Sequence, residues 1–340
     1  MKQLRKTIYK YITITMAVSL FFCFLGNYAH AQTAKAIVLT LCGTVAPSDP
    51  EHWATMRFAD LVFKKTKGMV RVAVFPAGQL GGQVENMEAI RAGTLDMFVT
   101  GDTLLIPYYS PIALIMMPYL WNDLDHLHRF YDSSLGLEMF DNFRNTSGIR
   151  VITELDRGAR QITNSVRPIN SVKDLEGLKI RVPEDPVLIE IFKAWGAKPT
   201  AVDWKEIYTS LSQGLVDGQD NGIDTVFGAK LAEVQKYFAF TDHVFMGYPI
   251  VMSDKKFLSL PQEYQQAVLE AGKESTQYRR ELLKTTESQN LKEMVEKHGM
   301  IVTHPDKTGF KEKAKDLWKI FVPKFGKEFE KYYLEAKKIK

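Results

Sequence analysis

The sequence predicts an α/β protein with two lobes and one long helix late in the chain. Apolar, β-branched runs alternate with helix-compatible segments, as at 69–75, 84–92 and 96–100. Such alternation is typical of sheets whose strands are joined by helices. Residues 32–340 are enough for two hydrophobic cores. Because no flexible linker interrupts them, we expect the chain to cross between the lobes several times.

The first 31 residues predict export. Four basic residues precede an apolar run at 11–25, and Ala29-His30-Ala31 stands before Gln32 as a small-x-small cleavage pattern. These features are typical of a secretory signal peptide cleaved after Ala31. An uncleaved anchor is the weaker alternative, because the run is shorter than the ~20 residues that a spanning helix needs. We expect the mature chain to be soluble and periplasmic.

Removal of this segment changes the charge balance of the protein. The segment holds four of the 44 basic residues and none of the 40 acidic ones, so the mature chain has equal numbers of each. This balance argues against nucleic-acid binding, which requires a net basic domain. Only Cys42 remains in the mature chain, which excludes an intramolecular disulfide.

Strands and helices alternate in the first half of the sequence. We expect strands at 37–42, 69–75 and 96–100, and helices at 52–65 and 84–92. Gly68 and Gly93 follow the two helices as C-cap candidates. The stretch 69–100 is therefore a candidate for a right-handed βαβ unit.

The second half repeats the alternation and then changes. We expect strands at 149–153 and 178–182, and helices at 186–195 and 204–213. From 261 to 298 almost every residue is a good helix former, with Pro261 suited to the first turn and Gly299 to the C-cap. One helix of this length would span roughly 55 Å and cross from lobe to lobe. The alternative is a hairpin of two helices that turns near Gly272.

Several motifs resemble catalytic or metal sites without completing them. Ser253 to Lys256 matches S-x-x-K and 307–309 matches K-T-G, but the S-x-N element of penicillin-recognising enzymes is missing. The stretch from Asp217 resembles half of a calcium loop, with Gly228 where the bidentate glutamate should stand. We therefore expect no catalytic residue, metal site or cofactor.

Two arginines and an asparagine form a better recognition pattern. Arg181 ends an apolar strand just before a proline, and ligands of open α/β sheets dock at such strand ends. Its guanidinium matches a carboxylate through two parallel hydrogen bonds. Arg160 lies in a glycine-containing segment, where we expect it to be less constrained, and Asn221 offers both a donor and an acceptor. The local alternative is that Arg181 is a surface arginine paired with an aspartate.

Trp204 opens the expected helix at 204–213 and has two interpretations of about equal weight. It is either a core residue or an aromatic face for the carbon skeleton of a ligand. The second interpretation favours a monocarboxylate that carries hydroxyl or keto groups.

The chain as a whole resembles the DctP-type extracytoplasmic solute receptors of TRAP (tripartite ATP-independent periplasmic) transporters. The resemblance covers essentially the whole mature chain and rests on motifs in a fixed order: VFPAGQLGGQVENMEAIRAGTLDM (74–97), MMPYLW (116–121), INSVKDLEGLKIRVP (169–183), IYTSLSQGLVDGQDN (207–221), EVQKYFAFTDH (233–243) and the long late helix. It implies a two-lobed periplasmic binding protein fold, with a cleft that closes over the ligand and a long helix that crosses both lobes. Lobe I would comprise 32–157 and 247–286, and lobe II 158–246 and 287–340.

The resemblance also implies roles for individual residues. Arg181 would bind the ligand carboxylate, and Arg160 and Asn221 would make further polar contacts. Trp204 would stack on the ligand. From the first lobe we expect Thr44 and Asp102. At Gly222 the chain departs from relatives that carry proline or asparagine, which leaves the pocket for the ligand side chain undefined.

The function implied is capture of a small organic acid and its delivery to TRAP membrane subunits by a monomeric receptor. A sugar acid, a hydroxy or oxo acid and a dicarboxylate all suit an Arg181-centred site. A sensor component that signals to a membrane histidine kinase, and less favourably an exported enzyme, are the alternatives.

Overall fold

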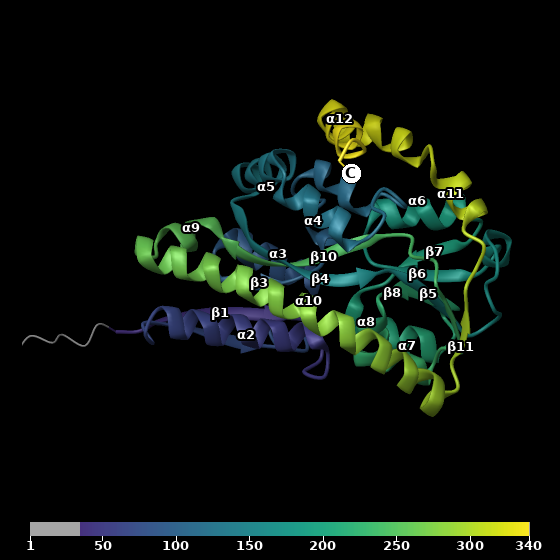
Figure 1. Cartoon of the computed structure of the whole chain (residues 1–340), viewed down its shortest axis with the longest axis horizontal. Helices are drawn as coiled ribbons and strands as arrows, with labels where there is room; N and C mark the ends of the chain where they lie inside the picture. Colours follow the sequence, from purple (N-terminus) through teal and green to yellow (C-terminus); the bar gives the residue numbers. More distant parts are fainter. Residues whose placement is uncertain (1–34, 340) are drawn as a thin grey trace, which may run out of the picture. The chain divides into compact units, whose positions relative to one another are not determined.

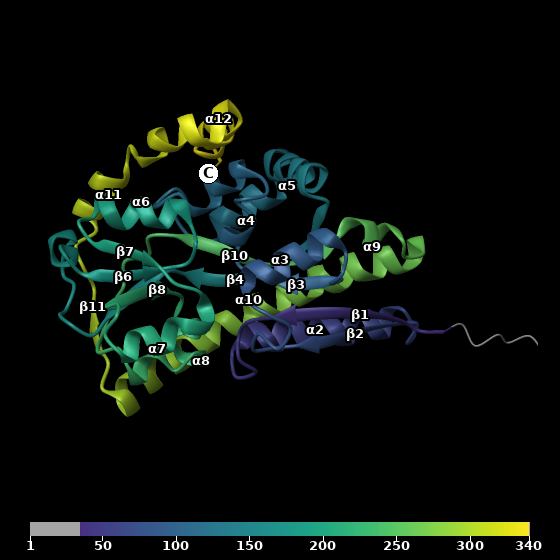
Figure 2. The same cartoon turned by 180° about the vertical axis from the view of Figure 1, so that it is seen from behind.

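The computed structural model describes residues 35–339, so the expected signal peptide and its cleavage point lie outside the described residues. One compact unit, from Val38 on, carries both lobes. Two sheets organise it, with helices around them (Figures 1 and 2). The predicted α/β class is confirmed.

The first lobe is built on a five-stranded sheet with the order β2-β1-β3-β10-β4. Strands β1 and β3 run parallel, whereas β10 is antiparallel to both β3 and β4. The strands are β1 (Ile37–Gly43), β2 (Val70–Phe75), β3 (Met97–Val99), β4 (Ile149–Ala159) and β10 (Phe245–Ser253). Because β1 lies between β2 and β3, the expected βαβ unit spans a strand instead of joining neighbours.

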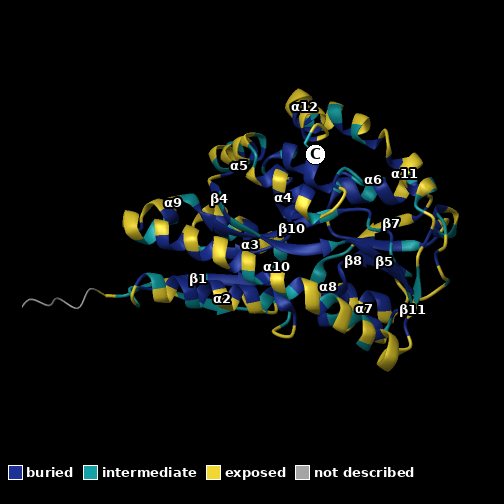
Figure 3. Ribbon diagram, in the orientation of Figure 1, coloured by how far each residue is buried: buried dark blue, intermediate teal, exposed yellow. Residues whose placement is uncertain are grey.

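The helices between these strands begin and end at clear signals. Asp49 caps α2 through the Glu51 N–H, and Gly93 ends α3 in the left-handed conformation with φ of 75°. The elements are α2 (Pro50–Lys65), α3 (Gln83–Ala92), the short 3₁₀ helices η1 (Asp102–Leu104) and η2 (Ser110–Met116), α4 (Leu124–Asp132), α5 (Ser134–Ser147) and α9 (Asp254–Leu258). The α-helices carry both buried and exposed residues, whereas η1 and η2 have no exposed residue (Figure 3).

The second lobe is built on a six-stranded sheet with the order β11-β9-β5-β8-β6-β7. Its strands are β5 (Gln161–Asn164), β6 (Lys179–Val182), β7 (Lys198–Ala201), β8 (Gly218–Asn221), β9 (Tyr237–Ala239) and β11 (Ile301–Thr303). Its helical elements are η3 (Val172–Leu175), α6 (Pro186–Ala194), η4 (Trp204–Glu206), α7 (Ile207–Ser212), α8 (Ile223–Gly228), η5 (Leu231–Glu233) and α11 (Thr308–Ala314).

Three segments connect the two sheets. Strand β4 of the first sheet leads within one residue, Arg160, into β5 of the second sheet, and β9 leads back into β10. The strand predicted at 149–153 therefore continues to Ala159, through polar residues that do not read as strand. The third connection is the long helix α10 (Gln262–His298).

Helix α10 is one continuous helix of 37 residues, so the long-helix prediction is confirmed and the hairpin alternative is excluded. Arg279 of α10 forms ion pairs with both lobes, with its Nη2 3.0 Å from Asp224 of α8 and its Nε 3.6 Å from Glu51 of α2. Gly272 lies against β4, where an added Cβ would stand 3.0 Å from the Thr153 Cβ. This glycine therefore permits close packing of helix and strand.

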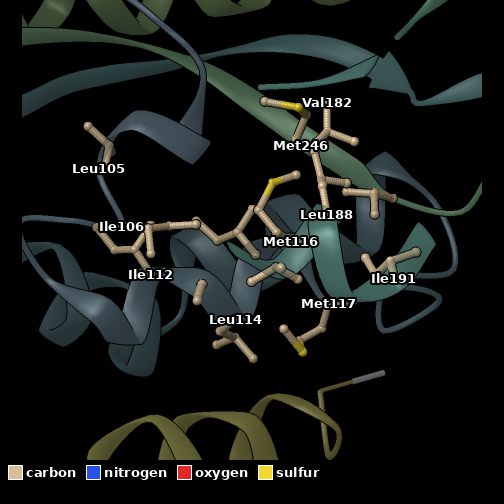
Figure 4. Close-up of a cluster of buried hydrophobic side chains, with 14 of the residues drawn as sticks. Leu105, Ile106, Ile112, Leu114, Met116, Met117, Val182, Leu188, Ile191 and Met246 are labelled. Carbon is tan, nitrogen blue, oxygen red and sulfur yellow. The ribbon is translucent and has the colours of Figure 1, made fainter. Parts of the chain in front are cut away.

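An apolar cluster joins the two lobes. Met116 and Met117 at the end of η2 pack with Leu188 and Ile191 of α6 (Figure 4). The C-terminal helical segment α12 (Leu317–Ala336), which is kinked at Gly326, contacts η2 and α5, and the Tyr332 hydroxyl lies 3.2 Å from Glu138. This part of 287–340 therefore packs on the first lobe, contrary to expectation, because its aromatic face meets the apolar η2 segment. The other lobe boundaries stay a proposal.

None of the helices among the described residues is long and apolar enough to cross a bilayer.

Candidate ligand-binding site

A small pocket lies where the crossing strands meet the carboxyl ends of β6 and β8. Both lobes and the crossing strands contribute to its wall. The lining residues are Gln83, Gly101, Thr103, Arg157, Arg160, Arg181, Pro183, Trp204, Asn221, Met246 and Tyr248. Four of the six residues expected at the site, Arg160, Arg181, Trp204 and Asn221, are thus brought together.

Arg181 lies on β6, between strands β7 and β8 of the second sheet. It pairs in register with Thr200 of β7 and Gln219 of β8, and only 2% of its surface is exposed. Its Nε donates a hydrogen bond of 2.9 Å to the Val202 carbonyl. Burial, and then the neighbouring Arg160, lower the pKa of Arg181 to about 10, so the side chain stays charged at neutral pH. The surface-arginine alternative is therefore wrong.

Arg160 is held more tightly than expected. Its Nε lies 2.5 Å from Asp220 Oδ2, its Nη2 donates to the Asp220 carbonyl at 2.7 Å, and its Nη1 is 3.3 Å from the Met246 sulfur. His243 shares the same Asp220 oxygen at 3.1 Å. Although burial raises the pKa of Asp220, Arg160 and His243 outweigh it and lower that pKa below its usual range. The expectation of a mobile Arg160 is corrected, because the side chain is locked in a buried ion pair.

Asn221 ends a chain of side-chain hydrogen bonds. Its Nδ2 donates to Gln219 at 2.7 Å, Gln219 donates to Thr163 at 2.8 Å, and Thr163 donates to Gln235 at 3.0 Å. Gln235 in turn donates to the Val234 carbonyl at 3.0 Å. Because every donor in the chain points the same way, the orientation of the Asn221 amide is set.

Trp204 lies between the second-lobe core and the cavity. Its ring is half-buried and packs against the second-lobe core, and it also lines the cavity. The guanidinium carbon of Arg181 lies 5.8 Å from the ring centroid. The Asp203 carboxylate caps the turn that begins here by accepting from the Lys205 N–H at 2.9 Å.

Thr44 and Asp102, the two residues expected from the first lobe, do not line the cavity. Asp102 Oδ2 accepts hydrogen bonds from the Gly247 N–H at 2.8 Å and from the Tyr131 hydroxyl at 3.2 Å. Burial raises the pKa of this carboxyl to about 7. The carboxyl is therefore engaged with β10 behind the wall, and its neighbours Gly101 and Thr103 face the cavity instead.

Arg157 is the principal residue that the sequence reasoning missed. It lies near the end of β4 and stacks on Tyr248 of β10, with its guanidinium carbon 3.8 Å from the ring centroid. Gln83, Thr103 and Met246 were also missed. A signal existed, because 156–160 holds two arginines around a glycine, and only the second of them was expected at the site.

The chemistry of the wall is that of an anion receptor. The described residues that line it include three arginines and no carboxylate, histidine or cysteine. Within residues 35–339, no group of three His, Cys, Asp or Glu side chains is arranged to hold a metal ion.

Comparison with known proteins agrees with this geometry. Residues 41–324 match the family model described as bacterial extracellular solute-binding protein, family 7 (DctP). The 2,3-diketo-L-gulonate-binding periplasmic protein YiaO of Escherichia coli K12 is 31% identical over 263 residues, which cover 77% of this chain and 80% of YiaO.

Two solved TRAP periplasmic solute-binding proteins have the same fold. One, from Polaromonas sp. JS666 with bound D-erythronate, has a TM-score of 0.84 and 26% identity, covering 89% of this chain and 99% of its own. The other, from Sulfurospirillum deleyianum with bound succinate, has a TM-score of 0.83 and 26% identity at the same coverage. This chain therefore belongs to the DctP family of bacterial extracellular solute-binding proteins, the receptors of TRAP transporters.

Proposed function

We propose that this protein captures a small organic acid through its carboxylate and delivers it to the membrane subunits of a TRAP transporter. The observation that carries the proposal is the buried guanidinium of Arg181, whose one hydrogen bond within residues 35–339 uses Nε. A buried charge without a close counter-ion is costly. A ligand carboxylate would supply that counter-ion through two parallel hydrogen bonds to the terminal nitrogens.

The other lining residues support a short polar ligand. Trp204 offers an apolar ring beside Arg181, against which a carbon chain can pack. The Asn221 amide, with one of its hydrogens already donated to Gln219, retains an oxygen that can accept from a ligand hydroxyl. Arg160 contributes mainly through its ion pair with Asp220, which orders this side of the wall.

Residues of both lobes line the cavity, which supports binding coupled to closure. We propose that residues 1–31 direct export and are removed after Ala31, which places the mature receptor in the periplasm. We propose that it acts there as a monomer. An enzymatic role is not favoured, because the described lining residues offer no base beside a nucleophile.

The test is a thermal-shift screen of the mature protein, followed by calorimetry on the acids that raise its unfolding temperature. Acids such as erythronate, galactonate, succinate and 2,3-diketogulonate would be compared with the neutral polyols erythritol and galactitol. A ligand that binds only the folded state raises the unfolding temperature, so we expect stabilisation by acids alone. Equal stabilisation by the neutral polyols would contradict carboxylate recognition.

A further inference from the structure

Arg157 has the features of a second anion-binding residue. Only 6% of its surface is exposed, and it lines the cavity. Its Nε donates a hydrogen bond of 2.8 Å to the Thr225 hydroxyl, and its guanidinium lies over the Tyr248 ring. Its Nη1 is buried and has no hydrogen-bond partner within residues 35–339. Buried donors are almost always paired in folded proteins, so we expect Nη1 to donate a hydrogen bond to a bound ligand.

The three arginines of the wall differ in their counter-ions. Arg160 has a carboxylate at 2.5 Å, that of Asp220. The nearest carboxylate oxygen to Arg157 belongs to Asp49 and lies 3.9 Å from Nη2, well beyond the 2.7–2.9 Å of a charge-assisted hydrogen bond. Arg181 has no carboxylate within ion-pair distance among the described residues. Two guanidinium groups of the wall therefore lack a close carboxylate.

The surroundings of these two groups also differ. Arg181 is anchored within the second lobe, through Val202 and beside Trp204. Arg157 stacks on a tyrosine of the first-lobe sheet and faces Asp49, the N-cap of α2. Burial and then Arg160 lower the pKa of Arg181, whereas for Arg157 the effect of burial is outweighed by Tyr248, Asp49 and Glu51, which raise its pKa. The two guanidiniums thus occupy different parts of the wall.

We propose that Arg157 binds a second carboxylate, at the end of the ligand remote from the one held by Arg181, and that the preferred ligands are small dicarboxylic acids. This inference rests on the proposed function, because it assumes that Arg181 holds the first carboxylate. A dicarboxylate preference differs from the monocarboxylate preference that the aromatic face of Trp204 alone indicates.

The setting of Arg157 suits selectivity. Thr225 fixes Nε and the Tyr248 ring supports one face of the guanidinium, so Nη1 is held in place before the ligand arrives. A terminal hydroxyl could accept one hydrogen bond from Nη1 but would bring no negative charge to the guanidinium, whose nearest carboxylate oxygen lies 3.9 Å away. A carboxylate would satisfy both the hydrogen bond and the charge.

The experiment compares acids of equal chain length that differ only at the far end. Calorimetry on the mature protein would measure galactonate against galactarate, and erythronate against meso-tartrate. We expect the better diacid to bind more tightly than its monoacid partner. In Arg157→Gln, affinity for that diacid should fall by roughly 30-fold or more, while affinity for the monoacid changes by less than about threefold.

Arg150→Gln is the matched control. Arg150 lies on the same strand β4 and also stacks on an aromatic ring, with its guanidinium carbon 4.3 Å from the Phe257 centroid. Its Nε lies 2.8 Å from Asp254, away from the cavity. This variant should leave the affinities for all four acids unchanged. Arg157→Lys, which keeps the charge, should retain part of the preference for diacids.

The outcomes separate the inference from the proposed function. Binding of monoacids with no gain for the diacids would overturn the role of Arg157 and leave the proposed function standing. Equal losses for both acids in Arg157→Gln would also overturn it, because they would mark Arg157 as a structural residue. If none of the acids binds, both ideas fail.

Discussion

Replacing Arg181 by alanine should abolish tight ligand binding without unfolding the protein. The side chain is almost fully buried, and its hydrogen bond within residues 35–339 goes to the Val202 carbonyl. Truncating one partner of a buried charge pair costs ~2–5 kcal/mol, which is roughly 30- to 4000-fold in affinity. Because the ligand carboxylate would lose its direct counter-ion in a dry site, we expect a loss in the upper part of this range.

The same replacement should not lower the stability of the unliganded protein. Burial and Arg160 lower the pKa of Arg181, which means that folding disfavours its charged form. Removing the guanidinium relieves this cost, while the Val202 carbonyl loses one hydrogen bond. We therefore expect an unfolding temperature without ligand that is unchanged or slightly raised.

Calorimetry with the strongest acid from the screen would measure the affinity, and thermal unfolding without ligand would measure stability. Arg181→Lys keeps the charge but loses the planar fork, so its affinity should lie between those of the parent and Arg181→Ala. Lys198→Ala removes the same charge from an exposed position on the neighbouring strand and should change neither quantity. An affinity of Arg181→Ala within about threefold of the parent would refute the reasoning.

Three further predictions concern the surroundings of the cavity. Burial raises the pKa of Asp185 to about 7, so the contribution of this carboxyl to stability is greatest below pH 4 and is lost as pH rises through 7. The unfolding temperature of Asp185→Asn should therefore rise relative to that of the parent between pH 5 and pH 8. A difference in unfolding temperature that does not change with pH would contradict this. Thr163→Val breaks the hydrogen-bond chain that orients Asn221 and should weaken ligand binding by roughly tenfold, whereas Thr163→Ser should not, as calorimetry can check. Saturating ligand should reduce the radius of gyration measured by small-angle scattering. The decrease should be smaller in Gly228→Val, because an added Cβ at Gly228 would lie 3.2 Å from Asp49. An unchanged radius of gyration with bound ligand would argue for a rigid receptor.

Much of the fold could be predicted because its elements carry local signals. Helix α10 follows from its composition and from the caps at Pro261 and Gly299, and α6 from a proline at its start and a glycine behind it. Strands such as β6 are short apolar runs. Strand β8, with the sequence GQDN, could not be recognised, because its polar residues are buried by tertiary hydrogen bonds and not by their own hydropathy.

The candidate site could be predicted only where backbone position determines the direction of a side chain. Arg181 precedes a proline at a strand end, and this local pattern was enough to place it in the cavity wall. Asp102 has no such pattern, and its carboxyl points to the Gly247 N–H, a contact between residues 145 positions apart. Arg157 was missed because 154–157 holds three charged residues and does not read as strand, although Asp156 and Arg157 are buried in β4.

The residues that line the cavity and the residues that connect the lobes are partly the same. Arg157 and Arg160 flank Gly158, whose φ of 82° bends the crossing strand in a conformation that favours glycine. Met246 and Tyr248 of the wall lie on the opposite crossing strand, β10. If the lobes close by bending at these crossing strands, a ligand held by these side chains would restrain the bend. Contacts between the ligand and these side chains would favour the closed state. An acid that contacts Arg181 but not Arg157 should therefore bind without producing full closure.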